Sequence, residues 1–411
     1  MERRVIHVYT TSIHSIHPAG KTLDYSRYTS LWHFRLARHL QAASDEYAQE
    51  CWAIDSKLSE EVKWERDGIS VRVFPCTKLR YVGEYSSDLI RALKAESRRQ
   101  GAILVFHGLF SYSTLLSPLL LKRAPMVVQH HGGLSLLQQG QHSSRTAIKL
   151  GAFTLHVLSG YWFLERAAIP RFDRIFVLNS EEEEYVTRLA GKEKVLRLTM
   201  GIDFNEFVQT NKDSAREMLA LAPHKRYILF VGNLVIKKGL EYLLRALPVI
   251  LKQCPPAVLL IVGTGHNRAR LVKLAQELGV DASVEFVPSD ETLPRVPDDA
   301  LPLYYSAADV VVMPSLSEGL PIVGLEALAC GAPLVATSVA GIPDIVATFK
   351  AGVLVEPRSP EALARAVTDV LLGKKSFVID RQRGERAYDW RVIAAKNLAV
   401  YDALFREYYC K

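Results

Sequence analysis

The chain has few cysteines and no long apolar run. Its 411 residues include five cysteines, whose spacing matches neither a metal site nor a redox pair. A sparse, odd set of this kind indicates a reducing compartment rather than a disulfide-bonded framework. No run of about 18 residues is apolar enough to cross a bilayer, and the N-terminal residues lack the apolar segment of a signal peptide. We therefore expect a cytoplasmic location.

Acidic residues are missing from a long interval of the first half. None occurs between Glu96 and Glu165, and the net charge of the whole chain is +7. Residues 1–205 hold 27 Lys and Arg against 21 Asp and Glu, and residues 206–411 hold 24 against 23. The anionic inner face of a membrane would suit the basic half, although a basic surface that only aids solubility explains it equally well. We expect no nucleic-acid partner, because no recognisable binding module accompanies the charge.

The order of apolar segments predicts an α/β fold in two domains. The length exceeds what one hydrophobic core normally serves, and short apolar runs typical of buried strands alternate with helical patterns. Strand runs occupy residues 4–11, 46–54, 103–108, 126–133, 174–180, 226–233, 257–265, 283–288, 308–315 and 333–339. Helical patterns occupy residues 28–43, 240–253, 269–279 and 360–374. We place the first domain at 1–205 and the second at 206–392, with the ligand cleft between them at the carboxyl ends of the strands.

The stretch SEGLPIVGLEALACG, residues 317–331, places two carboxylates near the start of a helix. Glu318 falls in the loop after a buried strand, and Glu326 falls within a helix that is apolar on nearly every side. The free amides and the dipole at the start of that helix suit an anion such as a phosphate. An ionised carboxylate inside such a helix needs partners, which ribose hydroxyls, an internal Arg or backbone donors would each supply.

This stretch resembles the E-x7-E signature of the retaining GT-B glycosyltransferases of family GT4, also called group 1. Other segments resemble the same family in the same order: VGNLVIKKGLEYLLRAL (231–247), LLIVGTG (259–265), VEFVPSD (284–290) and GVLVEP (352–357). The likeness is strong over residues 174–401 and looser before them. It implies a GT-B fold, in which two Rossmann-like domains face each other across a cleft. It also implies that the final helix, about 393–411, crosses back to the N-terminal domain.

The resemblance implies a nucleotide-sugar site in the second domain. Glu318 would bond to hydroxyls of the transferred sugar, Glu326 would hold the ribose, and Lys238 would neutralise the diphosphate as it leaves. The implied donor contacts are Gly232, Asn233, Gly263, Gly265, Gly319, Leu320, Pro321, Ile322, Val323 and Glu326. Because the helix N-terminus and Lys238 replace a cation, and no Asp-x-Asp motif is present, we expect no metal and no cofactor.

The chain departs from the family at Asn233, where a second basic residue is usual. Asparagine offers a neutral amide in place of a charged fork. Lys237 and Arg268 are both candidates for supplying the missing charge, and the sequence does not rank them. The same departure leaves a non-catalytic nucleotide-sugar-binding homologue as the alternative function.

The acceptor site is implied in the first domain, where two strands end in His-Gly pairs. The resemblance places a cleft histidine at the second pair, and His131 is favoured over His130 because it directly precedes the glycine. Adjacent residues on a strand point in opposite directions, so one of the two faces the cleft. His107 ends the earlier strand. In the loop after the first strand, Gly20 alone matches the family's glycines, and Arg27 lies at a position suited to the acceptor.

The expected activity is that of a retaining hexosyltransferase. It would move a sugar from a UDP- or GDP-sugar to a hydroxyl of a glycan or lipid-linked acceptor, in glycan, glycolipid or surface polysaccharide synthesis. Residues 136–170 carry large apolar side chains bracketed by basic ones, which predicts either a membrane-facing segment or a helix hairpin packed on the sheet. A phosphorylase or an epimerase of the same fold is disfavoured because we recognise neither signature. A dehydrogenase is disfavoured because no G-x-G-x-x-G follows a strand.

Overall fold

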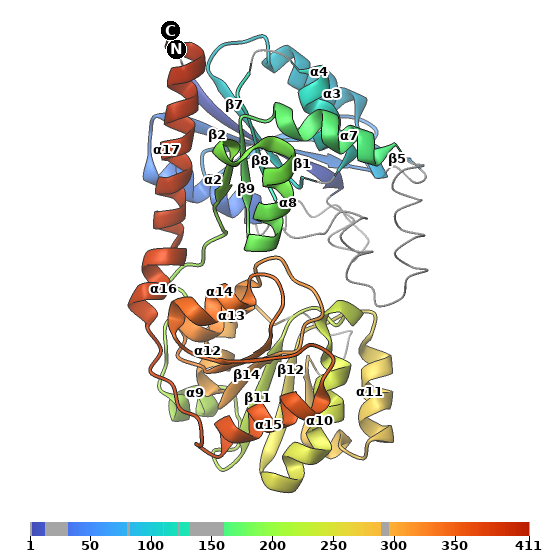
Figure 1. The fold of residues 1–411 in the computed structure, drawn as a ribbon, viewed down its shortest axis with the longest axis vertical. Coiled ribbons are helices and arrows are strands. Elements are labelled where there is room, and N and C mark those ends of the chain that lie inside the picture. Colours follow the sequence, from blue (N-terminus) through green and yellow to red (C-terminus); the bar gives the residue numbers. More distant parts are fainter. Residues whose placement is uncertain are drawn as a thin grey trace. The chain divides into compact units, whose positions relative to one another are not determined.

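A computed structural model shows the chain as two compact α/β units, each a sheet flanked by helices (Figure 1). The structure describes residues 2–12, 32–79, 83–109, 111–121, 124–130, 160–288 and 296–410. Unit 1 comprises Met1–Thr199 and Trp390–Lys411, and unit 2 comprises Met200–Asp389. The division at Thr199 falls slightly earlier in the chain than the predicted one.

Unit 1 is built on an eight-stranded sheet in the order β10-β9-β8-β7-β1-β2-β4-β3. Its strands are β1 (Arg3–Ser12), β2 (Tyr47–Asp55), β3 (Val62–Arg66), β4 (Ile69–Pro75), β7 (Ala102–His107), β8 (Met126–Gln129), β9 (Arg174–Val177) and β10 (Val195–Arg197). All neighbours pair in parallel except β3 and β4, which form an antiparallel hairpin at one edge. The short strands β5 (Thr77–Leu79) and β6 (Gly83–Tyr85) form a separate ribbon.

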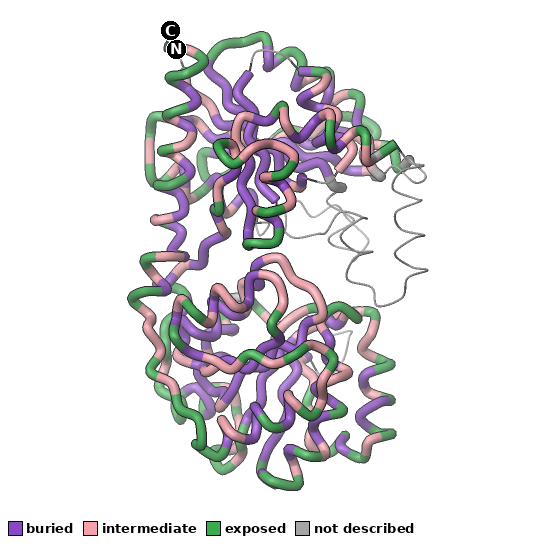
Figure 2. The backbone as a smooth tube through the Cα atoms, in the orientation of Figure 1, coloured by how far each residue is buried: buried purple, intermediate pink, exposed green. Residues whose placement is uncertain are grey.

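Helices cover the sheet of unit 1. They are α2 (Trp32–Ala43), α3 (Ser87–Glu96), α4 (Tyr112–Leu120), α7 (Tyr161–Ala168), α8 (Ser180–Ala190) and α17 (Trp390–Tyr409). Every residue of β7 and β8 is buried, and β2 is buried at seven of its nine positions, so both faces of the sheet are covered there (Figure 2).

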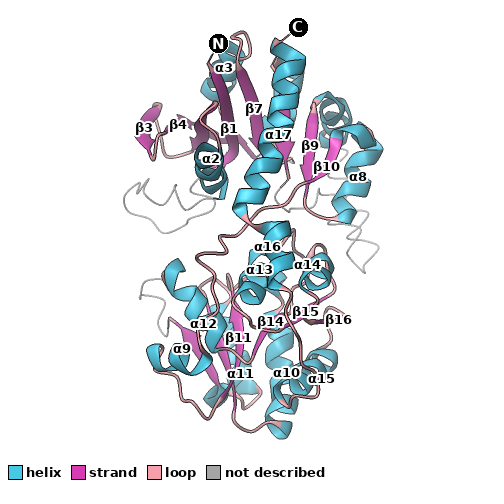
Figure 3. Cartoon of the chain, turned by 90° about the vertical axis from the view of Figure 1, so that its left-hand side faces the viewer, coloured by secondary structure: helices cyan, strands magenta, loops and turns pink. Residues whose placement is uncertain are grey.

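The C-terminal helix α17 belongs to unit 1. It packs against α2, and the Tyr47 hydroxyl donates to a carboxylate oxygen of Asp402 at 2.8 Å. Near the end of the helix, the Tyr409 hydroxyl donates to the carbonyl of Ala102 at 2.9 Å. Figure 3 shows α17 running across the sheet of unit 1. The expected return of the final helix to the first unit is confirmed.

Unit 2 is built on a six-stranded sheet, parallel throughout, in the order β13-β12-β11-β14-β15-β16. Its strands are β11 (Arg226–Val231), β12 (Ala257–Val262), β13 (Val284–Val287), β14 (Val310–Met313), β15 (Leu334–Thr337) and β16 (Val353–Val355). Its helices are α9 (Lys212–Met218), α10 (Leu240–Gln253), α11 (Arg268–Glu277), α12 (Leu301–Ala307), α13 (Ile322–Ala329), α14 (Ile342–Phe349), α15 (Pro360–Leu371) and α16 (Arg381–Tyr388).

The element boundaries in unit 2 follow local chemistry. Helix α10 coincides with the predicted helix, and its leucines form one buried face. The predicted strand runs are shortened where glycine follows, as at β12, which ends one residue before Gly263. That glycine has φ +148°, a conformation that residues other than glycine rarely adopt. No helix in the described part of the chain combines the length and apolar character needed to cross a membrane.

Candidate active site

Two loops at the carboxyl edge of the unit 2 sheet are held together backbone to backbone. One loop follows β11 and contains the short 3₁₀ turn Ile236–Lys238, and the other joins β14 to α13. The amide of Leu316 donates to the carbonyl of Lys237 at 2.8 Å. Gly239 has φ +66°, and a Cβ there would overlap the carbonyl oxygen of Pro314. Glycine is therefore required for this contact between the loops.

This contact brings the two predicted catalytic residues of unit 2 together. The Lys238 ammonium donates to Glu318 Oε1 at 2.6 Å, and the Ser315 hydroxyl donates to the same oxygen at 2.6 Å. The side chain of Lys238 is 18% exposed and that of Glu318 is 7% exposed. The ion pair thus offers a cation at the strand ends while keeping the carboxylate fixed and hydrogen-bonded.

The predicted donor glycines lie where adjacent strand ends pack closely. Gly232 and Gly263 follow β11 and β12, and a Cβ on Gly263 would overlap the carbonyl oxygen of Gly232. Gly265 has φ +157°, and its Cβ would meet the backbone of Leu234. These positions leave bare backbone at the sheet edge. Asn233 lies between them on an exposed position of the loop.

The start of α13 is shaped by its neighbours in the next loop. Pro321 is the N-cap residue, and Ile322 and Val323 form the first turn. The amide of Gly341 donates to the carbonyl of Gly319 at 3.1 Å. The side chain of Leu320 is buried. The helix therefore begins at a fixed point, and its first turn is suited to an anion.

The carboxylate of Glu326 is held by a tyrosine on another helix, α12. Glu326 is 9% exposed, and Tyr305 on α12 donates its hydroxyl to Glu326 Oε2 at 2.6 Å. This tyrosine hydroxyl is a partner that sequence analysis missed, because the two residues lie on different helices with a strand between them. A carboxylate has about four lone-pair positions, so it can accept the tyrosine hydroxyl together with further donors such as ribose hydroxyls.

The histidines at the strand ends of unit 1 are buried. His107 is fully buried, and its Nε2 lies 2.9 Å from Nδ1 of His7. His7 Nε2 lies 3.1 Å from the side-chain oxygen of Gln49, whose amide nitrogen donates to a backbone carbonyl. His7 Nε2 must therefore carry the proton, and His107 must donate to His7 Nδ1. Burial lowers the pKa of His7 to about 4 and that of His33, whose ring lies beside His107, to about 3.

His130 lies beside the carboxyl group of Glu182 on helix α8. It directly follows β8, and its Nε2 lies 3.4 Å from Glu182 Oε1 in the first turn of α8. Glu182 Oε2 also accepts the amide of Leu178 at 2.8 Å. Burial lowers the pKa of His130 to about 4 and raises the pKa of Glu182 to about 7.

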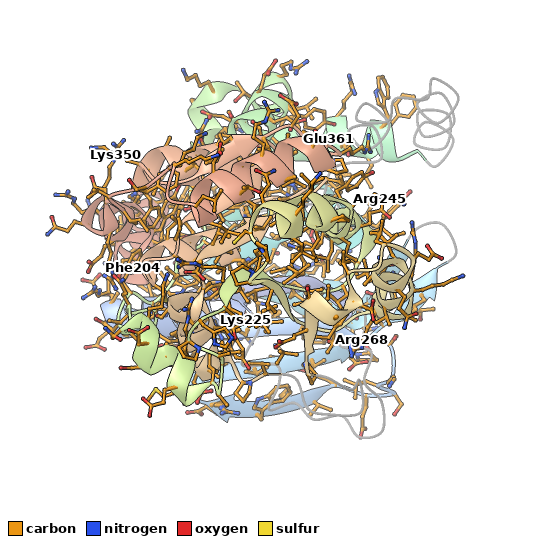
Figure 4. All side chains as sticks on the ribbon, turned by 90° about the horizontal axis from the view of Figure 1, so that it is seen from below. Phe204, Lys225, Arg245, Arg268, Lys350 and Glu361 are labelled. Carbon is orange, nitrogen blue, oxygen red and sulfur yellow. The ribbon has the colours of Figure 1, made fainter. Side chains whose placement is uncertain are left out.

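Several predicted residues lie outside the described part of the chain. These are His131, Gly20, Arg27 and most of the segment 136–170. Lys237 and Arg268 are the two candidates to replace the basic residue that is usual at position 233. Lys237 is exposed. Arg268, labelled in Figure 4, begins α11, and its guanidinium lies 4.6 Å from the ring centre of Phe286. It lines a cavity of about 490 Å³ between α11 and β13.

Among the described residues, no cluster of histidine, cysteine and acidic side chains has the arrangement of a metal site. The expectation of a metal-independent enzyme stays a prediction.

The described geometry can be compared with known proteins. Residues 211–390 match the family "Glycosyl transferases group 1". This segment belongs to that family. The group 1 segment contains all the predicted donor residues, including Lys238, Glu318 and Glu326.

Relatives of known sequence carry glycosyltransferase names. An uncharacterized glycosyltransferase from Methanocaldococcus jannaschii is 37% identical over 46% of this chain and 48% of its own length. D-inositol 3-phosphate glycosyltransferase from Mycolicibacterium smegmatis is 31% identical over 59% of this chain and 56% of its own length. The chain therefore spans about half the length of the curated relatives it matches.

Solved structures extend the likeness to the whole fold. Sucrose-phosphate synthase from Thermosynechococcus elongatus has a TM-score of 0.71 at 22% identity, covering 98% of this chain and 100% of its own. Anabaena HepE in complex with UDP has a TM-score of 0.71 at 16% identity, covering 97% and 100%. The fold outside the group 1 segment is therefore also that of these proteins, and the predicted GT-B fold class is confirmed.

Proposed function

We propose that this chain is a retaining glycosyltransferase that moves a sugar from a UDP- or GDP-sugar to a hydroxyl of a glycan or lipid-linked acceptor. The observation that carries the proposal is the ion pair between Lys238 and Glu318. The pair lies at the carboxyl edge of the unit 2 sheet, within the group 1 segment. Glu326 lies on the helix that begins beside the pair. The solved complexes of HepE with UDP and UDP-glucose support a nucleotide-sugar donor.

Each residue has a role that fits its position. Breaking the bond between the sugar and the diphosphate places negative charge on the leaving oxygen, and a fixed cation stabilises that charge. Lys238 supplies the cation, and the amides at the first turn of α13 bind the distal phosphate. Glu318 accepts hydrogen bonds from hydroxyls of the transferred sugar, and Glu326 accepts them from the ribose. No metal enters these steps.

The acceptor side belongs to unit 1. His107 ends β7 and His130 follows β8, and both are buried, so each would act through the backbone or by supporting a neighbouring residue. Gly20 and Arg27 keep the acceptor roles that the family resemblance implies, and His131 keeps its implied catalytic role. The names of the curated relatives suggest a small phosphorylated cyclitol as one acceptor to test first.

Helix α7 supports a peripheral membrane role. Phe163 is 62% exposed, and the guanidinium of Arg166 lies 3.9 Å from the ring centre of Trp162. An exposed aromatic residue beside a cation suits the interface of an anionic bilayer. Flotation with vesicles of phosphatidylglycerol should carry the wild-type chain and leave Phe163→Ser behind. If neither the wild type nor the variant floats with the vesicles, the membrane role is contradicted.

The first experiment is thermal unfolding of the full chain with UDP, GDP, ADP and dTDP. A ligand bound by the folded state raises the melting temperature, by an amount that grows with its concentration. We expect UDP or GDP to stabilise the wild type and to leave Glu326→Ala unchanged. If no nucleotide stabilises the wild type, the proposal fails.

A non-catalytic nucleotide-sugar-binding protein is the second candidate, and the exposed Asn233 favours it. Release of nucleoside diphosphate from UDP- or GDP-sugars, in the presence of acceptor candidates, separates the two functions. Binding without release supports the second candidate, and release of the diphosphate supports the transferase.

A further inference from the structure

Tyr305 joins the helix that carries Glu326 to the segment at the start of unit 2. Its side chain is fully buried on α12, and its hydroxyl donates to Glu326 Oε2 at 2.6 Å. On its other side, the ring of Phe207 lies 6.3 Å away, with an angle of 57° between the ring planes. The tyrosine is thus fixed by an aromatic contact at one face and by a charge-assisted hydrogen bond at its tip.

A second contact holds the same parts together. The guanidinium of Arg381 donates to the carbonyls of Phe204 at 2.6 Å and Phe207 at 3.1 Å. It also donates to the carbonyl of Ala329, the last residue of α13, at 3.1 Å. Phe204, labelled in Figure 4, lies under this guanidinium at 5.1 Å from its ring centre. Segment 204–207, Tyr305 and α13 therefore form one connected support for Glu326.

The hydrogen bond decides how the carboxylate of Glu326 is presented. The terminal torsion of a glutamate side chain has broad minima, so packing alone leaves its two oxygens free to exchange places. A short bond from Tyr305 to Oε2 fixes the plane of the carboxylate. The remaining lone pairs then have defined directions, which is what recognition of a pair of ribose hydroxyls requires.

We propose that Tyr305 is a positioning residue that makes the donor site select a ribonucleotide over its 2′-deoxy counterpart. The inference rests on the proposed function, because it takes Glu326 as the ribose ligand. Tyr305 itself touches no substrate in this scheme. It acts through Glu326, and its loss weakens ribonucleotides more than 2′-deoxynucleotides, which present only the 3′-hydroxyl to the carboxylate.

The test is calorimetric titration of the full chain with UDP and GDP and with dUDP and dGDP. We expect the wild type to prefer the ribonucleotide about tenfold, as for a hydrogen bond to a charged group. Tyr305→Phe keeps the ring that packs on Phe207 and removes the hydroxyl. It should lower the affinity for the ribonucleotide more than that for the deoxynucleotide, so that the ratio of the two affinities falls towards one.

Tyr304 provides a matched control on the same helix. It is the preceding residue, it is half-buried, and Tyr304→Phe removes a hydroxyl in the same way. That variant should keep the wild-type ratio. A double-mutant cycle with Glu326→Gln adds a second readout, since Tyr305→Phe should change nothing further once the carboxylate is gone.

The outcomes separate the inference from the proposed function. If the wild type binds a ribonucleotide and Tyr305→Phe keeps its preference, the positioning role is wrong and the transferase proposal stands. The same conclusion follows if the wild type binds the ribonucleotide and its 2′-deoxy counterpart equally. If the wild type binds none of the four nucleotides, the proposed function and this inference fall together. Should Tyr305→Phe melt below the assay temperature, Phe207→Leu keeps the hydroxyl and should show a smaller loss in the ratio; an unchanged ratio there overturns the inference.

Discussion

The polar groups near the carboxyl edges of the two sheets differ in burial and in charge. In unit 2, Lys238 and Glu318 form a partly exposed ion pair on loops held by glycine contacts. In unit 1, His107 ends β7 and is fully buried, as is His7 within β1, and burial keeps His7 uncharged. One architecture thus offers a charged edge in one unit and a neutral, hydrogen-bonded edge in the other. This difference fits the proposal that unit 2 binds the negative charge of the leaving diphosphate.

The largest expected effect follows from removing the cation of unit 2. Lys238→Ala should lower the rate of sugar transfer by about 10²–10³, the usual loss when a group that stabilises developing charge is removed. The rate is measured as release of nucleoside diphosphate at saturating donor. Lys252→Ala, at an exposed position in the last turn of α10, is the control and should keep most of the rate. Equal loss in both variants contradicts the assignment of Lys238.

The glycine contact between the loops can be tested by a matched pair. Gly239 and Gly279 have φ of +66° and +65°, but a Cβ on Gly239 would overlap the Pro314 carbonyl, whereas a Cβ on Gly279 meets nothing within 4 Å. Gly279→Ala should cost about 1–2 kcal/mol of unfolding free energy, from the left-handed conformation alone. Gly239→Ala should cost at least about 3 kcal/mol, because the loops must separate as well. Urea unfolding measures both, and equal costs would contradict the close approach.

The buried histidines of unit 1 should make stability depend on pH. Burial lowers the pKa of His33 from 6.5 to about 3, so below pH 6.5 the unfolded chain binds a proton that the folded chain does not. The unfolding free energy therefore falls as pH falls, by about 1.4 kcal/mol per pH unit for each such group. His33→Phe retains a ring against Tyr9 and should flatten the slope between pH 6 and 5 by that amount. The exposed His224→Phe should leave the slope unchanged.

The pair of His130 and Glu182 should contribute little to this slope. Burial lowers the pKa of the histidine to about 4 and raises that of the glutamate to about 7. Between pH 4.5 and 6.5 the folded pair holds one proton on the carboxyl group, and the unfolded pair holds one on the imidazole. Proton uptake on unfolding therefore cancels within the pair. Glu182→Gln should break the cancellation and steepen the slope by about one proton. A slope that stays unchanged would contradict it.

The smallest effect is a gain. Asn233→Arg restores the basic residue that the family usually has, at an exposed position where substitution changes stability by about 0.5 kcal/mol or less. A second cation near the leaving diphosphate should raise the transfer rate by about two- to tenfold. Asn233→Ala separates the effect of the new charge from loss of the amide. A rate that falls in the arginine variant would show that another residue already occupies that role.

Much of unit 2 could be predicted from the sequence because its elements are local and regular. Helix α10 has one leucine face, and the strands beside it are continuous apolar runs, so each segment states its own structure. The family resemblance implied that Glu318 and Lys238 share the donor site, but their ion pair was not predicted, since the two residues come from loops far apart in the chain. Tyr305 could not be found, because nothing in a helical pattern says which side chain of a neighbouring helix reaches a carboxylate.

The histidines show the opposite limit. A His-Gly pair after an apolar run looks the same whether the ring faces a ligand or the core. In β7 every residue is buried, so alternation along the strand carries no information about the direction of His107. The antiparallel hairpin of β3 and β4 was also missed. Strand β3 has mostly polar side chains and no buried residue, whereas β4 alternates buried and more exposed residues, a strand signal that was not used.

Arg381 has a practical consequence for anyone who wishes to isolate unit 2. The family match begins at residue 211, but the carbonyls that this guanidinium binds include those of Phe204 and Phe207. A protein trimmed to the match would lose both acceptors, the aromatic neighbour of Tyr305 and the parallel bridge between Ile202 and Asp389. The shortest fragment worth expressing therefore starts at Met200, ahead of the boundary that sequence similarity suggests.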